Sequence, residues 1–421
     1  MPLELIILLS MLAVFALGVF GAKLPSGVAL VLAAITGAIV GGEGIPIRHL
    51  VEGSFGYFDA VLIIATAMIF MKVLDASGAL GTLGHLLMKS LYRWPTMLFV
   101  FIALFVMFPG MLTGLSSACI LTTGALVAPA MLAMRIPAPA VGSFIAMLAV
   151  YGMIAPPINI PVMIIGGGVD MPYIGFEKPL AIASFPLALI AALYYRFRYV
   201  RTIDIEEVLS KLPPPVYAQH GIKLFAPLAV VVLLMVVIRV LPQYVPDIGI
   251  PLIFILGSIV GLFTGEKMPW WTTARTAIRD ALPVMVILVG VGMFVQIMTL
   301  TGVRGFLAVS ALKLPPAFLY VGIALLMPAF GSAYASASVI GVPLVYVFLG
   351  KNEIVVTSAL SLIAGLGDLM PPPMLLCAFA SQIVGEKNQF LILKRSVPLM
   401  ILSLLAAIAM IAFADSVAKI Y

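Results

Sequence analysis

Runs of apolar residues, most of them close to the length of a bilayer-spanning helix, recur along the whole 421-residue chain. About 20 such residues in a helix cross the hydrocarbon core of a membrane. Because a segment in lipid must satisfy its own backbone hydrogen bonds, these runs predict membrane-spanning helices. No alternating pattern typical of barrel strands competes with them. Examples of the runs are Leu3 to Phe20, Leu24 to Val40, Val61 to Met71, Leu180 to Tyr195, Leu224 to Val240, Leu282 to Met298 and Val397 to Phe413.

The composition excludes several classes of protein. Charged residues make up 10% of the chain and hydrophobic ones 63%, whereas soluble domains carry about 25% charged residues. The net charge of 23 − 17 = +6 is not gathered into basic clusters with interleaved aromatics, so nucleic acid is not an expected partner. Cys119 and Cys377 lie far apart in apolar runs, and no metal-ligand spacing occurs. We therefore expect a protein of the lipid bilayer without a resident cofactor or metal site.

The first apolar run is expected to be a transmembrane helix. Its only charged side chain is that of Glu4, whereas a cleaved signal peptide begins with a basic region.

One polar stretch, residues 196–223, interrupts the apolar pattern near the middle of the chain and contains the run Pro213-Pro214-Pro215. It predicts a solvated linker between two halves. The expected organisation is a first repeat over residues 1–198, a cytoplasmic linker over 199–222 and a second repeat over 223–421.

The two halves share an ordered set of features. A glycine- and serine-rich segment precedes a proline pair in each, and both Ser117 to Ser332 (332 − 117) and Pro156 to Pro371 (371 − 156) are separated by 215 positions. Helix pairs are expected at Thr96 to Met134 and Pro316 to Leu349. Arms of the second pair are short for the roughly 30 Å hydrocarbon core, which favours a re-entrant hairpin.

An odd number of crossings per half, taken as five, makes the repeats inverted. Placing the central linker in the cytoplasm puts most of the 23 Lys and Arg residues on that side, as the positive-inside rule requires. Both termini then lie outside. The predicted fold class is an all-α polytopic membrane protein with two inverted repeats, re-entrant hairpins and proline-broken helices.

Two proline pairs interrupt apolar runs and mark candidate binding positions. Pro156 and Pro157 form the first break, and Pro371 and Pro372 form the second. Proline opens the helical hydrogen-bond ladder, and the freed carbonyls must face protein, water or an ion. Structural kinks are the alternative for each break alone, but breaks at matching positions of two repeats favour a site for substrate and coupling ion.

Polar residues at the breaks and at the predicted hairpin tips complete the candidate site. Asp368 is a carboxylate within an apolar run, where it must have a partner or a function; capping of the following half-helix is the alternative. Asn159, at the first break, is its polar counterpart. Small-residue packing is the alternative for the tips, whose candidate ligands are Thr113, Gly114, Ser116, Ser117, Ser332, Ser336 and Ser338.

At these residues the sequence resembles the large membrane subunit of tripartite ATP-independent periplasmic (TRAP) transporters. The matching segments are Gly114 with Ser116-Ser117, Gly152 to Pro157, and Gly367 to Pro372. Ile158 stands where that family has serine, and Met370 where it has threonine. The resemblance implies sodium-coupled uptake of a small organic anion such as a carboxylate across a bacterial-type inner membrane. It also implies an elevator-type transporter, in which the hairpins and broken helices move against a scaffold. The two partners it implies are a small four-helix membrane subunit and a periplasmic substrate-binding protein.

Two alternatives remain open. A stand-alone ion-coupled anion symporter of the same superfamily would need neither partner. An intramembrane aspartyl protease would use Gly365-Leu366-Gly367-Asp368, but it needs a second aspartate at the same depth; we do not expect an enzyme. The chain has no phosphate-binding Gly-x-x-x-x-Gly-Lys-Ser/Thr loop, so transport energy is expected from an ion gradient. The resemblance implies Na⁺ as the coupling ion.

Overall fold

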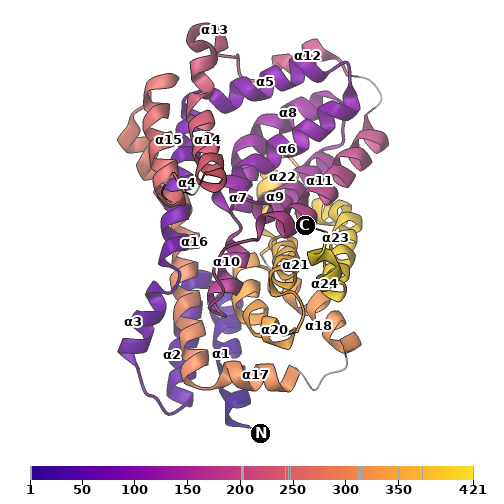
Figure 1. The fold of residues 1–421 in the computed structure, drawn as a ribbon. Coiled ribbons are helices and arrows are strands. Elements are labelled where there is room, and N and C mark those ends of the chain that lie inside the picture. Colours follow the sequence, from indigo (N-terminus) through magenta and orange to yellow (C-terminus); the bar gives the residue numbers. More distant parts are fainter. Residues whose placement is uncertain are drawn as a thin grey trace.

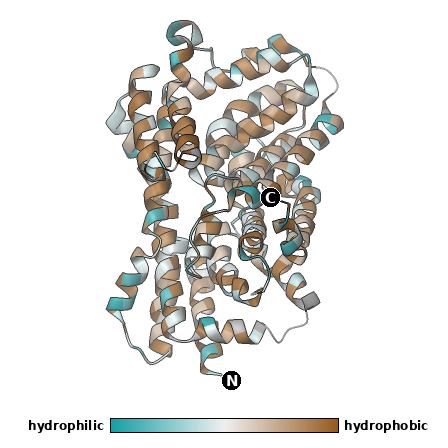
Figure 2. Ribbon diagram, in the orientation of Figure 1, coloured by the Kyte–Doolittle hydropathy of each residue, from teal (hydrophilic) through white to brown (hydrophobic). Residues whose placement is uncertain are grey.

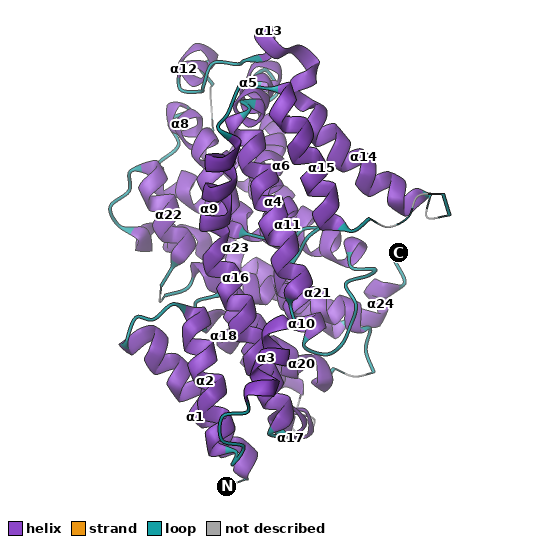
Figure 3. Ribbon diagram, turned by 90° about the vertical axis from the view of Figure 1, so that its left-hand side faces the viewer, coloured by secondary structure: helices purple, strands orange, loops and turns teal. Residues whose placement is uncertain are grey.

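The computed structural model describes residues 2–200, 203–241, 243–244, 246, 248–311, 316–348, 350–371 and 373–420. Within these ranges every regular element is a helix (Figures 1 and 3). Seven of the described helices are long and apolar enough to cross a membrane, or eight if the bent pair α3 (Ile47–Phe55) and α4 (Phe58–Ala76) forms one span. Hydrophobic residues cover most helices, while hydrophilic ones lie mainly in short helices and connections (Figure 2). The predicted all-α polytopic membrane fold is confirmed.

A first group of helices, here called the scaffold, is arranged around one long helix with 31 residues. That helix, α16, packs against α2, α3 and α4, and α15 packs against α4 and α14. Glycines allow the close crossings: a Cβ on Gly290 would lie 2.4 Å from the carbonyl oxygen of Gly27. Besides α3 and α4, the scaffold contains α1 (Leu3–Ala16) with its π-helical end η1 (Leu17–Gly21), α2 (Ser26–Val40), α14 (Ala226–Val240), α15 (Ile250–Thr264) and α16 (Trp270–Leu300).

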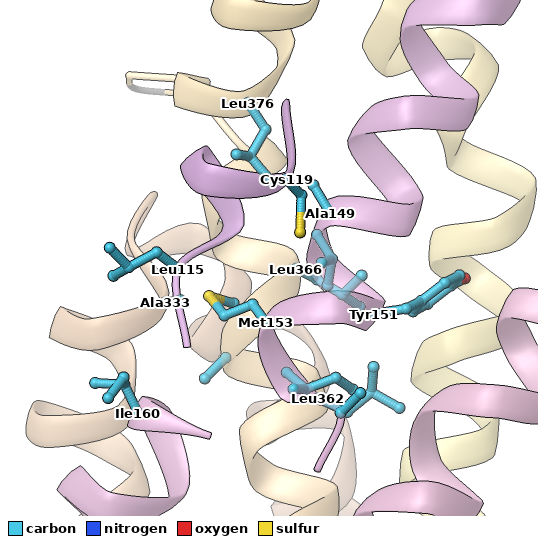
Figure 4. Packing of buried hydrophobic residues seen from close by; sticks show 14 of the residues in the cluster. Leu115, Cys119, Ala149, Tyr151, Met153, Ile160, Ala333, Leu362, Leu366 and Leu376 are labelled. Atoms are coloured by element: carbon cyan, nitrogen blue, oxygen red, sulfur yellow. The ribbon is translucent and has the colours of Figure 1, made fainter. Parts of the chain in front are cut away.

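The second group, here called the hairpin bundle, is centred on α9 (Ala138–Ile154). Residues 140–154 of this helix are all buried, and α9 packs against α6, α11, α22 and α23; Figure 4 shows part of this core. The other elements of the hairpin bundle are α6 (Pro95–Thr113), α7 (Ser116–Cys119), η2 (Ile120–Gly124), α8 (Ala125–Ala133), α10 (Ile160–Gly167), α11 (Glu177–Tyr199), α18 (Pro316–Ala329), α19 (Ala333–Ser336), η4 (Ala337–Gly341), α20 (Val342–Val347), α21 (Glu353–Gly365), η5 (Leu366–Leu369), α22 (Leu375–Val384), α23 (Gln389–Ala412) and α24 (Ala414–Ala418).

Both expected hairpins are present as two helical arms joined by a tight turn. The turns are formed at Gly114 (φ 67°) and Gly331 (φ 65°), because glycine adopts the left-handed conformation without a steric cost. These glycines are 331 − 114 = 217 positions apart, so the tips correspond at an offset of 217 and not the predicted 215. Ser332 therefore corresponds to Leu115, and the first half has two extra residues between tip and break.

Each hairpin resumes after its turn as a helix with a π-helical stretch, η2 in the first and η4 in the second. Figure 1 shows α6 and α8 in the upper part of the molecule and α18 and α20 in the lower part, so the hairpins enter from opposite ends. This arrangement agrees with inverted repeats. The repeat boundaries, and the side of the membrane on which each end lies, stay predictions.

Two arm helices connect the scaffold with the hairpin bundle. The arm α5 (Ala79–Leu91) packs between α4 and α6, and the arm α17 (Val303–Ala311) packs against α16 and α20. The expected linker forms the short helices α12 (Ile205–Ser210), α13 (Tyr217–His220) and η3 (Gly221–Phe225). It contacts α5, where the backbone N–H of Val216 donates to Thr82 Oγ1 over 3.1 Å.

Candidate functional site

The tips of the two hairpins touch inside the hairpin bundle. The hydroxyl of Tyr334, from the second tip, donates to the carbonyl oxygen of Gly114 in the first tip over 3.2 Å. Gly114 is crowded as well as left-handed, because a Cβ there would lie 2.4 Å from Cγ1 of Ile160. Only glycine meets both conditions at this point of the chain.

Asp368 joins the two tips through its carboxylate. It lies in η5, directly after α21, and only 4% of it is exposed. Ser116 Oγ donates to Oδ2 over 2.7 Å, and the backbone N–H of Ala333 donates to Oδ1 over 2.8 Å. Ser116 begins the continuous helix Ser116–Ala133 and Ala333 begins Ala333–Val347. The carboxylate thus accepts from the first residues of both second arms, where the helix dipoles favour negative charge.

A cavity of about 160 Å³ opens beside Asp368 at the boundary between the scaffold and the hairpin bundle. Phe15 of the scaffold and Phe330 of the second tip stack across this boundary, with ring centroids 6.2 Å apart. The scaffold lines the cavity with Phe15, Val19, Ser26, Pro283, Val284 and Ile287. The hairpin bundle lines it with Ser116, Ser117, Phe330, Gly331, Ser332, Tyr334, Asp368, Pro373 and Leu375.

Four of the predicted site residues line this cavity: Ser116, Ser117, Ser332 and Asp368. Ser332 also caps the second arm, with its Oγ accepting from the backbone N–H of Ala335. Thr113 lies behind the first tip: its Oγ1 donates to the carbonyl oxygen of Pro109 and accepts from the N–H of Leu115.

The first break is not part of the cavity lining. The peptide bond between Pro156 and Pro157 is cis, and the carbonyl oxygen of Pro157 accepts from the hydroxyl of Tyr173. Asn159 caps α10, because its Oδ1 accepts from the N–H of Val162 over 2.9 Å. Its Nδ2 donates to the carbonyl oxygen of Ile154 and to Ser361 Oγ. The expected ligand oxygen of Asn159 is thus engaged in holding the break together.

The remaining predicted residues lie along the second half. Ser338 Oγ donates to the carbonyl oxygen of Ala335, whereas Ser336 Oγ is buried without a hydrogen-bond partner among the described residues. Pro371 forms a turn after Asp368 and is exposed. Pro372 lies outside the described residues.

Sequence reasoning missed the apolar side of the cavity. Phe15, Pro283, Phe330 and Tyr334 line it, and none of these was among the candidate ligands predicted from the sequence. A proline within the long apolar run of α16 was the one available signal for Pro283. Nothing in the local sequence distinguishes Phe15 from phenylalanines that face lipid.

A second contact missed from the sequence centres on Arg304, on the arm α17. Its guanidinium donates to Thr299 Oγ1 at the end of α16, to the carbonyl oxygen of Gly168 and to the hydroxyl of Tyr346. The side chain of Arg304 therefore connects the scaffold to the end of α10 and to the second arm of the second hairpin.

Comparison with family models and with curated proteins finds no match. Among solved structures, the chain is similar to the YdaH transporter of Alcanivorax borkumensis, which is described as having an unusual topology. The two share 17% sequence identity with a TM-score of 0.61, over 87% of each chain. The chain has the fold of a membrane transporter. At this identity the likeness establishes the fold, and the resemblance to TRAP subunits stays a prediction.

Proposed function

We propose that the protein is a cation-coupled secondary transporter, with Na⁺ as the coupling ion and Asp368 as the residue through which the ion acts. The observation that carries the proposal is the carboxylate of Asp368 bridging two hairpin tips beside a cavity. A buried charge of this kind is costly and marks ion or substrate pathways in membrane proteins. A cation beside Asp368 would compensate the charge and change the contacts that hold the tips together.

Sodium fits the chemistry of the tips. Hard cations prefer oxygen ligands, and the cavity beside Asp368 offers hydroxyl oxygens from Ser116, Ser117 and Ser332. Since no histidine lines the cavity in the described residues, proton coupling would depend on Asp368 itself.

An elevator-type movement is the second part of the proposal. The cavity lies where the scaffold meets the hairpin bundle, and the arms α5 and α17 connect these two groups. Movement of the hairpin bundle along the scaffold would carry a bound solute with it. The excess of basic residues in the predicted inner loops supports a cytoplasmic linker, with both termini outside an inner membrane.

The TRAP resemblance adds a finer version of the function: import of an organic anion, with a small membrane subunit and a periplasmic binding protein as partners. This version rests on the sequence resemblance alone, because the helix starts at the tips already donate to Asp368. A stand-alone symporter is the alternative, and co-purification with a small four-helix subunit would separate the two.

An aspartyl protease is disfavoured by the same geometry. Among the described residues, no second carboxylate lines the cavity with Asp368. Asp280 pairs instead with Lys72 over 2.8 Å, and Asp59 borders a different cavity beside α4.

The test is thermal stability of the purified protein in detergent against NaCl, with KCl and choline chloride at equal ionic strength. Binding to the folded state stabilises by RT ln(1 + [L]/Kd), or about 2.7 kcal/mol at 100 times Kd. We expect a saturable, sodium-specific rise in Tm that Asp368→Asn abolishes. A rise equal in all three salts would exclude a sodium site in this state and leave coupling to protons through Asp368.

A further inference from the structure

We infer that the transported solute is a small molecule with an apolar body and a cationic or uncharged polar group, not a carboxylate. The inference concerns the cavity at Asp368 and rests on the proposed function. It starts from the charges around that cavity.

Among the described residues, the cavity carries one negative group and no positive side chain. Asp368 is the only acidic side chain of its 15 described lining residues, and none of these is Lys, Arg or His. No ion pair to Asp368 occurs in the described part of the chain. Arg304, which ties the scaffold to the hairpin bundle, contacts Thr299, Gly168 and Tyr346 instead. A coupling Na⁺ would compensate Asp368 alone, so an anionic solute would find no counter-charge among the described lining residues.

The donors best placed to hold a substrate carboxylate are already in use. The N–H of Ala333 and the hydroxyl of Ser116 begin the second arms of the two hairpins, and both donate to Asp368. The chain's own carboxylate thus occupies the position between the two helix starts that an anionic solute would need. Hydrogen bonds stabilise this charge, but they do not cancel it.

The rest of the lining suits an apolar body. Phe15 and Val19 of the scaffold face Phe330 and Leu375 of the hairpin bundle around a space of about 160 Å³. Aromatic faces attract cations as well as apolar groups. The solute is accordingly small and partly apolar, and its polar group lies toward Asp368.

The electrostatic part of the inference can be tested without knowing the solute. Ser26→Cys places a thiol on the scaffold side of the cavity, and Ser117→Cys places one on the hairpin side. Each is treated in sodium-free choline buffer with a cationic (trimethylammonium-ethyl) or an anionic (sulfonato-ethyl) methanethiosulfonate. Wild type, whose Cys119 and Cys377 are buried, gives the background. Ser90→Cys, at an exposed position of α5, gives the ratio of rates outside the cavity.

We expect the cationic-to-anionic ratio at both cavity positions to exceed that at Ser90→Cys by about tenfold or more, as an uncompensated carboxylate nearby requires. Asp368→Asn in the same backgrounds should bring the ratio close to the Ser90→Cys value. If that variant does not fold, the ratios measured in the variants that retain Asp368 still test the inference.

Three results would overturn the inference: equal ratios inside and outside the cavity, a ratio that favours the anionic reagent, or no reaction at either cavity position. Repeating the measurement in sodium separates the two proposals. If sodium alone lowers the cationic-to-anionic ratio at the cavity positions toward the Ser90→Cys value, ion binding at Asp368 is supported. If sodium leaves the ratio unchanged, the result counts against the sodium site but not against the inference. A reversal in sodium that favours the anionic reagent would instead restore a carboxylate as the solute.

Discussion

The hydrogen bond between Ser116 and Asp368 joins residues 252 positions apart, and its contribution can be measured with a double-mutant cycle. Ser116→Ala removes the donor, Asp368→Ala removes the acceptor, and the double variant removes both. A buried hydrogen bond to a charged group contributes about 1.5–3 kcal/mol. The double variant should therefore be less destabilised than the sum of the single variants by about this amount.

The expected shift in melting temperature follows from the size of the chain. Unfolding entropy of about 2.1 cal/mol/K per residue, for 421 residues, gives about 0.9 kcal/mol/K. A coupling of 1.5–3 kcal/mol then corresponds to about 2–3 °C of non-additivity. Thermal unfolding of the four proteins in sodium-free detergent buffer measures it.

The neighbouring serine supplies the control. Ser117 lines the same cavity, and no hydrogen bond joins it to Asp368 in the described structure. Ser117→Ala and Asp368→Ala should therefore show a smaller coupling energy than the Ser116 cycle, because no hydrogen bond joins the two side chains. If the Ser116 cycle were as additive as this control, the bridge between the tips would not exist as described, and the site built on it would have to be abandoned.

Three further predictions concern the hairpins and their attachment. Gly114→Ala should destabilise the protein by about 2–5 kcal/mol, because it adds left-handed strain and overlap with Ile160. Combining it with Ile160→Ala should recover only the part of the lost stability that is due to the overlap, as measured by thermal unfolding. Tyr334→Phe, which removes the donor to the Gly114 carbonyl oxygen, should lower stability by about 1 kcal/mol, and no loss of Tm would contradict a contact between the tips. Arg304→Gln should increase proteolytic cleavage of the second hairpin, because its three contacts hold the arm α17 in place, whereas Arg48→Gln, on an exposed side chain, should leave cleavage unchanged.

The membrane environment, the helices and the interruptions of those helices follow from local features of the sequence. Apolar runs and proline pairs are local signals, so the spans, both hairpins and both breaks were predictable. The glycine turns are local as well, and the offset between them was misjudged by two residues because serines were aligned instead of Gly114 and Gly331. Asp368 stood out because a carboxylate in an apolar run requires an explanation.

Which of these features meet depends on how the helices pack. It brought Asp368 to Ser116 and Ala333, left Asn159 as a cap of α10, and placed Phe15 of the first helix against Phe330. The physical reason is that lipid is as apolar as the protein interior, so a membrane helix does not show in its sequence which face turns inward. The contacts between distant helices, and with them the charge and shape of the cavity, follow from packing.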